Sequence, residues 1–422
     1  PGTEASSEEM RALAFGVDKA GEGTLEITSD WLDEEMEMSW MQEYVKKSDC
    51  GLTFLQTKGD AVKTILFSEE HFLKGKNIRP QFPGRNVGLM FGWETSVNPF
   101  IQFPAYKEIA DLPIDKKFEI LKDPLFKEKL LSQEPDFESE IRARLADNPS
   151  NKSREEIAQD VALPTTLTSN YKTQFILGTP PNYEPKEEDS IAAIASKKNI
   201  SELEVMYDEM LQNQGTNLIY AAFTPYEKYK LDFVEQAYQL KSSVAGGSDG
   251  GAHCGLICDA SMPTTNISHW GRDRESGRKF PLEMLIKKQT KDAAETFGLF
   301  DRGEIKPGML GDLNIIDFDK LNVSHPTMIH DLPLGGRRLV QDATGYIATI
   351  KNGQIVSENG KANGVLPGKL IRGKQVCEVK SGISEVSFFD KTIRLLAVKA
   401  YRFFWGLSGK SMQTTIVSDT EK

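Results

Sequence analysis

The sequence predicts an α/β fold with a parallel sheet, followed by a small antiparallel β domain. Two short strands, at 24–29 and 52–57, flank a helix at 33–47, and this order is a βαβ unit. The chain turns to antiparallel β after residue 302, where two alternating strands surround Asn352-Gly353, a strong hairpin signal. We therefore expect an α/β layer at 1–302 and a small β domain at 303–372.

The helices of the first hundred residues have recognisable ends. The helix predicted at 6–20 has Ser6 or Ser7 as its cap and Gly21 as its stop. The helix at 33–47 begins with acidic residues and ends with two lysines, as the helix dipole prefers. These signals define the first βαβ unit.

The middle of the chain breaks the βα rhythm. Residues 78–110 are dense in proline, glycine and aromatic residues, which indicates ordered loops that either line a cavity or pack on a core. Residues 111–160 are highly charged. We interpret about 95–185 as a charged helical insertion, either a lid or a solvated face.

The alternation then resumes. Helices are predicted at 186–198 and 201–212, a strand at 218–223 and a helix at 226–240. A short strand follows and places Asp249 at its carboxyl end, which is the edge where parallel α/β proteins hold their chemistry. Further along, we expect a helix at 281–296, a strand at 313–318 and the Asn-Gly hairpin at 346–357.

The run GSDGGAHCG, residues 247–255, is the most informative motif. Its glycines allow sharp turns and close approach of a ligand. Asp249 could take a proton from water or coordinate a metal, or it could close a turn by bonding its own backbone. His253, four residues later, could contact substrate or metal, or it could be structural.

Composition narrows the function classes. The chain has 422 residues and a net charge of -11, which argues against binding of nucleic acid. The four scattered cysteines indicate reduced thiols and a cytoplasmic protein. The polar N-terminus is not a signal peptide, and no apolar run suggests a membrane span.

Longer runs resemble a known family. These runs are GSDGGAHCGLICDASMPT, LEMLIKKQTKDAAETFGLFDRGEIKPGMLGDLNIIDFD, HDLPLGGRRLVQDATGYIATIKNGQIV and LPGKLIRG. They look like the amidohydrolase superfamily, in the branch of the N-acyl-D-amino-acid deacylases (D-aminoacylase-like). PGTEAS, AGEGTLEITSDW, LTFLQTK and the Pro-Asn-Tyr-Glu-Pro connection fit as well, so that the resemblance covers about residues 1–372.

The resemblance implies a (β/α)8 TIM-type barrel beside a small β-sandwich. It implies hydrolysis of a C–N amide bond, as in an N-acyl amino acid, by water activated on a divalent metal such as zinc. Asp249 matches the aspartate that shuttles the proton and faces the metal. A metal lowers the pKa of bound water to about 7, so this chemistry is physically reasonable. The resemblance leaves the oligomeric state open.

Two features depart from the family. The chain has no His-x-His pair, and it begins about where the fifth barrel strand is expected, which predicts a C-terminal half-barrel. Two predicted strands end in Thr28-Ser29 and Gln56-Thr57, which are not usual zinc ligands. Ser29 could instead bind substrate, and Gln56 could hydrogen-bond a substrate amide or be a polar residue packed at the strand end. The alternative function is therefore a catalytically inactive fragment that acts as a binding or scaffold module.

Two further regions carry predictions of their own. Arg272 and Arg274 could bind a substrate carboxylate, or they could form surface ion pairs. Residues 373–422 do not continue the family pattern. We interpret them as an unrelated tail that is helical or disordered, with an amphipathic basic-aromatic stretch at 393–405 that could lie on a membrane surface.

Overall fold

A four-stranded parallel sheet forms the N-terminal part of the molecule. The structure is a computed structural model, and it describes residues 5–29, 31, 33–56, 62–224, 226 and 228–376. The sheet has the order β1-β2-β3-β7. Its strands are β1 (Thr24–Thr28), β2 (Gly51–Leu55), β3 (Ile78–Pro83) and β7 (Val244–Gly246). The mixed α/β class and the parallel sheet predicted from the sequence are therefore confirmed.

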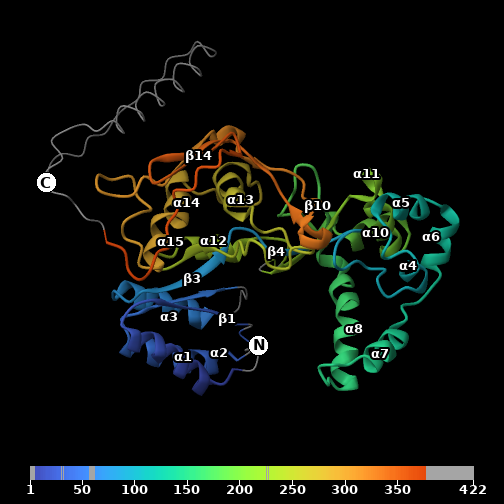
Figure 1. Cartoon of the computed structure of the whole chain (residues 1–422), viewed down its shortest axis with the longest axis horizontal. Helices are drawn as coiled ribbons and strands as arrows, with labels where there is room; N and C mark the ends of the chain where they lie inside the picture. The colour runs from blue at the N-terminus through green and yellow to red at the C-terminus, as the bar shows by residue number, and fades with distance from the viewer. Residues whose placement is uncertain are drawn as a thin grey trace, which may run out of the picture.

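Three helices cover one face of this sheet (Figure 1). They are α1 (Ser7–Ala20), α2 (Glu34–Lys47) and α3 (Val62–Leu73). Ser6 caps α1 by accepting a hydrogen bond from the Glu9 amide at 3.2 Å, and Gly21 ends it with a φ of 80°. The core between helices and sheet is aromatic and includes Trp40 and Phe54, both fully buried.

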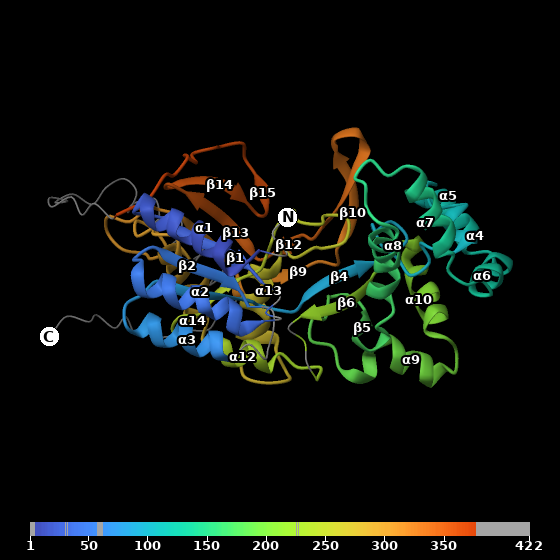
Figure 2. The same ribbon diagram turned by 90° about the horizontal axis from the view of Figure 1, so that it is seen from below.

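The chain between β3 and β7 forms a second unit, which lies to one side of the parallel sheet (Figure 2). It contains an antiparallel sheet, β4-β6-β5, and a group of helices around a separate core that includes Trp93. Its strands are β4 (Val87–Phe91), β5 (Gln174–Ile176) and β6 (Ile219–Thr224), and its helices are α4 (Pro104–Lys107), α5 (Ile114–Leu121), α6 (Pro124–Leu131), α7 (Phe137–Ala146), α8 (Arg154–Thr168), α9 (Ile191–Lys198), α10 (Glu202–Met210) and α11 (Gln212–Gly215). The charged helices predicted near 95–185 belong to this unit.

The prediction of loops throughout 78–110 was wrong at its start. Residues 78–83 form β3, a central strand of the parallel sheet, and 87–91 form β4. Pro80 and Pro83 concealed β3, because proline has no N–H to donate and is uncommon inside a sheet.

After the second unit, the chain returns to the parallel sheet. α12 (Asp232–Tyr238) precedes β7, and α13 (Met262–Ser268) comes after the Asp249 loop. The single helix predicted at 281–296 is two helices, α14 (Leu282–Gln289) and α15 (Lys291–Thr296). They are divided at Thr290, whose φ of -116° and ψ of -83° are not helical.

The C-terminal part is antiparallel, as predicted. Its main sheet has the order β15-β14-β13-β8, and β13 and β14 form the expected hairpin around Asn352-Gly353. The strands are β8 (Leu313–Ile316), β9 (Asn322–Val323), β10 (Thr327–Leu332), β11 (Gly336–Val340), β12 (Ala343–Thr344), β13 (Tyr346–Lys351), β14 (Gln354–Glu358) and β15 (Lys361–Ala362). Strands β10 and β11 form a separate hairpin that reaches toward the second unit (Figure 2).

Part of the predicted tail, residues 377–422, lies outside the described residues. Within the described part of the chain, none of the helices combines the length and the apolar character needed to cross a bilayer.

Two glycine substitutions compare a crowded position in the second unit with an open position on α1. A Cβ at Gly88 on β4 would lie 1.9 Å from the Tyr220 ring, so we expect Gly88→Ala to lower the free energy of unfolding by about 1–3 kcal/mol or more. Gly16 on α1 has open space around it, so Gly16→Ala should raise this free energy by about 0.5–1 kcal/mol. Urea unfolding of both variants measures the contrast, and equal stabilities would contradict the packing at Tyr220.

Candidate functional site

Asp249 lies in the loop that leaves the carboxyl end of β7. Its φ of 36° is unusual for a residue other than glycine, and its side chain is exposed. The turn here is closed by the main chain, because the Asp249 carbonyl accepts a hydrogen bond from the Ala252 amide at 3.1 Å. Within the described residues, the Asp249 carboxylate accepts no hydrogen bond. The carboxylate is therefore available to a ligand rather than used to close the turn.

Asp249 lines a cavity of about 300 Å³ between its own loop and strand β11. The main chains of the two walls are joined, since the Leu339 amide donates to the Cys254 carbonyl at 2.7 Å. Cys254, Ile257 and Val340 contribute apolar surface, and Arg338 adds a positive charge. The cavity thus combines apolar walls with a small number of charged groups, as small-molecule sites usually do.

A buried ion pair fixes the segment 258–261, which lines part of this cavity. The Arg85 Nη1 lies 3.1 Å from Asp259 Oδ1, and both side chains are inaccessible to solvent. Arg85 also donates to the Cys258 carbonyl at 3.1 Å and to Ser261 Oγ at 3.2 Å. Burial raises the pKa of Asp259 to about 6, although the Arg85 charge opposes this shift. Arg85 therefore anchors the segment 258–261 to the end of β3.

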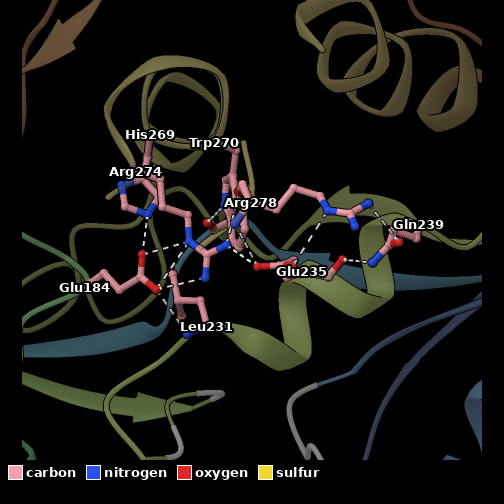
Figure 3. Close-up of polar contacts among 9 residues, drawn as sticks. Glu184, Leu231, Glu235, Gln239, His269, Trp270, Arg274 and Arg278 are labelled. Atoms are coloured by element: carbon pink, nitrogen blue, oxygen red, sulfur yellow. Dashed lines mark hydrogen bonds and ion pairs between the residues drawn. The ribbon is translucent and has the colours of Figure 1, made fainter. Parts of the chain in front are cut away.

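A second buried network holds the Pro-Asn-Tyr-Glu-Pro connection (Figure 3). Glu184 accepts hydrogen bonds from His269 Nε2 at 2.8 Å and from Arg274 Nε at 3.0 Å. Arg274 also donates to Glu235 on α12 at 2.5 Å. Burial alone would raise the pKa of Glu184, but the hydrogen bonds from His269 and Arg274 outweigh it and lower the pKa to about 2.

Arg274 belongs to this network, whereas Arg272, the other arginine suggested as a substrate ligand, makes separate contacts. Arg274 is fully buried and its guanidinium is shared by Glu184 and Glu235. Arg272 pairs with Asp273 and donates to the Leu321 carbonyl at 2.8 Å. Both side chains hold the fold together and neither lines the cavity beside Asp249.

The other predicted site residues lie outside that cavity. His253 is exposed, and its carbonyl accepts a bond from the Leu256 amide at 2.7 Å. Gln56 is fully buried directly after β2, where its main-chain N–H donates to the main-chain carbonyl of Gln81 at 2.9 Å. Ser29 Oγ donates to Glu37 Oε1 at 2.8 Å and accepts from the Trp31 amide. The structure thus brings Asp249, but not these three residues, to the cavity.

The residues that the structure describes do not fit a zinc site. No three of their histidine, cysteine, aspartate or glutamate side chains gather closely enough to hold a metal ion. The histidines are dispersed: His71 bonds the Phe67 carbonyl, His269 bonds Glu184, His325 bonds the Pro326 carbonyl and His330 lies 3.3 Å from Glu94. Asp249 therefore has no partner ligands for the predicted metal among the described residues.

Sequence reasoning missed Arg85 and Asp259. Arg85 follows β3, whose prolines made it look like a loop, and Asp259 lies in the apolar run Leu256–Ala260. The available signal was Asp259 itself, because a charged residue inside an apolar run is expected to be buried and to need a partner of opposite charge.

Comparisons with known proteins found a family profile and a solved structure that this chain resembles. Residues 231–357 match the profile of the Amidohydrolase family (Amidohydro_3), and no curated protein matches the chain. A solved structure, described as "Crystal structure of D-aminoacylase defines a novel subset of amidohydrolases", is similar at 16% identity with a TM-score of 0.42. The match covers 86% of this chain and 58% of the D-aminoacylase chain, so this chain spans little more than half of that length. The match to the amidohydrolase profile thus lies in the segment 231–357, which carries β7, the Asp249 loop and the β10–β11 hairpin.

Proposed function

We propose that the protein is a hydrolase of the amidohydrolase type that cleaves a C–N bond other than a peptide bond. The observation that carries this proposal is the exposed Asp249 carboxylate, which lines a cavity directly after β7 inside the family-matching segment. The position at the carboxyl edge of a parallel sheet is the usual place for catalytic groups in such folds.

The proposal extends to the architecture. The sheet β1-β2-β3-β7 corresponds to four consecutive strands of a (β/α)8 barrel, and the antiparallel sheets after residue 302 correspond to the small β-sandwich. The unit between β3 and β7 is then an insertion in a βα connection of the barrel. The substrate is an N-acyl amino acid or a similar small amide.

Asp249 would act as the proton-transfer group. Its carboxylate is exposed and accepts no hydrogen bond from the described residues, so it can accept the proton of a water that attacks the amide carbonyl. It can then deliver this proton to the leaving nitrogen. The Arg85–Asp259 pair keeps the loop beneath Asp249 in place. No step is assigned to a metal, because the described residues offer it no ligand set.

A binding or scaffold module is the second candidate function. The observation that favours it is the dispersal of the histidines, together with the use of Ser29 in a contact to Glu37. A module of this kind would keep the cavity but would not turn over an amide.

Turnover by the full-length protein separates the two candidates. Purified protein is incubated with a panel of N-acyl amino acids of both chiralities, and the free amino acid is measured by chromatography. Release of many amino acid equivalents per protein supports the hydrolase. Binding of a panel member without any release supports the module and removes the hydrolase proposal.

A further inference from the structure

Large apolar side chains gather on the surface near the C-terminal end of the described chain. They are Phe297, Phe300, Leu366, Leu370 and Ile371, and we call them the C-terminal patch. The side chains of Leu366 and Leu370 are 92% and 78% exposed. Two adjoining hollows in the surface are lined by these residues, and Ile371 belongs to the walls of both. Single exposed apolar residues are ordinary, whereas a continuous group of them marks an interaction surface.

Main-chain hydrogen bonds join the two segments that form the C-terminal patch. The Gln375 amide donates to the Gly298 carbonyl at 2.9 Å, and the Phe300 amide donates to the Gln375 carbonyl at 3.0 Å. Asn352 Nδ2 donates to the Pro367 carbonyl at 3.0 Å and fixes the segment from the other side. The patch is therefore attached to the body of the protein, at the end remote from the second unit (Figures 1 and 2).

Lysine and arginine side chains accompany these apolar residues. Residues 359–376 contain four lysines or arginines and no aspartate or glutamate, although the whole chain has a net charge of -11. Within the described part of the chain, the side chains of Lys369 and Arg372 line one hollow and form no hydrogen bond or ion pair. Lys374 Nζ lies 5.1 Å from the centre of the Phe300 ring. This surface is thus both apolar and positively charged.

The acidic residues nearest to the patch leave this charge largely uncompensated. Asp301 lines the same hollow as Lys369, but it forms an ion pair with Arg302 at 2.8 Å. Glu22 accepts a hydrogen bond from the Lys374 main-chain amide at 3.4 Å. An anionic partner therefore meets cations that have no carboxylate partner of their own among the described residues.

A bilayer that contains anionic lipids fits this surface better than a second copy of the chain does. Two copies that met through the patch would bring their lysines and arginines together, and like charges across an interface are unfavourable. An anionic bilayer attracts the cations and accepts the leucine side chains between its headgroups. The sequence that follows has the same character, because residues 391–410 carry five lysines or arginines, four aromatic residues and no acidic residue.

We infer that the C-terminal patch binds the surface of anionic membranes and holds the protein there as a peripheral protein. This inference concerns a different part of the molecule from the Asp249 cavity and is independent of the proposed reaction. Because the contact combines apolar insertion with attraction between charges, binding should require acidic lipid and should weaken as the salt concentration rises.

Co-sedimentation of the full-length protein with vesicles tests this inference. Vesicles of phosphatidylcholine and phosphatidylserine should bind the protein at least about tenfold more strongly than vesicles of phosphatidylcholine alone. The double variant Leu366→Ser with Leu370→Ser should lower the partition coefficient roughly 10- to 100-fold, because two inserted side chains are lost. Lys369→Gln with Arg372→Gln should lower it roughly 10- to 30-fold. Circular dichroism checks that each variant is folded.

Matched controls come from the second unit. Leu125→Ser with Leu163→Ser removes two other exposed leucines, and Lys116→Gln with Lys172→Gln removes two other exposed lysines. Both control pairs should leave the partition coefficient within about twofold.

Several outcomes would overturn the inference. They are an absence of vesicle binding, binding that does not need phosphatidylserine, and equal losses in a patch variant and its control. A dimer, detected by light scattering, that dissociates in Leu366→Ser with Leu370→Ser and does not bind vesicles would show that a second copy occupies the patch. Vesicle binding that survives both patch variants and is lost in Arg394→Gln with Arg402→Gln would place the membrane contact outside the patch.

Discussion

The Asp249→Asn variant of the full-length protein is expected to lose at least about 100-fold in kcat for amide hydrolysis while folding normally. A positioned acid–base group contributes about 10²- to 10⁴-fold, and an amide side chain cannot accept the proton. Asparagine tolerates the positive φ of 36° at this position, so the turn closed by the Asp249 carbonyl should persist. Initial rates of amino acid release, with circular dichroism as the fold check, measure the effect.

Asp342→Asn is the matched control. Asp342 is exposed and lies between two residues of the cavity wall, Gln341 and Ala343, but it does not line the cavity itself. The same change of charge at nearly the same distance from the cavity should leave kcat within about twofold. A normal kcat for Asp249→Asn, or an equal loss in both variants, would show that Asp249 does not transfer the proton.

Local signals in the sequence were sufficient for much of the fold. The cap at Ser6, the stop at Gly21 and the lysines at the end of α2 define elements through contacts within a few residues. The Asn352-Gly353 hairpin is equally local, since both residues adopt positive φ. Asp249 could be placed at a strand end for the same reason, because glycines mark the end of β7 on the chain itself.

The parts that the sequence could not supply depend on distant contacts. Arg85 and Asp259 lie far apart along the chain, and nothing in either local pattern names the other as its partner. Ser29 shows the converse case. Its position after β1 was correct, but the direction of its hydroxyl is set by Glu37 on α2. The end of a strand therefore predicts the position of a residue in the fold, but the hydrogen-bond partner of its side chain is determined by the tertiary structure.

The cavity wall on β11 also depends on contacts between distant parts of the chain. The motif HDLPLGGRRL was visible as a family run, but only the pairing of β10 with β11 puts Asp331 beside Arg338. The bond between Leu339 and Cys254 then brings that hairpin to the Asp249 loop. A site composed of a loop and a strand from two parts of the chain has no single local signature.

Stability should depend on Glu184 more than on any other carboxylate with a lowered pKa. Its side chain is almost fully buried and holds together the Pro-Asn-Tyr-Glu-Pro connection, the segment of His269 and Arg274, and the Leu231 amide (Figure 3). Its pKa falls from 4.5 to about 2, so the folded state favours the ionised form by about 3 kcal/mol. This stabilisation is present above pH 4.5 and is lost as the pH falls from about 4.5 to about 2.

The Glu184→Gln variant is therefore expected to lose about 2–4 kcal/mol of unfolding free energy at pH 7, because it leaves the buried Arg274 with Glu235 as its remaining carboxylate partner. Its stability should also fall less steeply than that of the unsubstituted protein between pH 4.5 and 2. Glu188→Gln, an exposed change nearby, should leave both quantities unaltered. Chemical denaturation across this pH range makes the comparison. Parallel curves for the two variants would mean that Glu184 does not hold the connection through its charge.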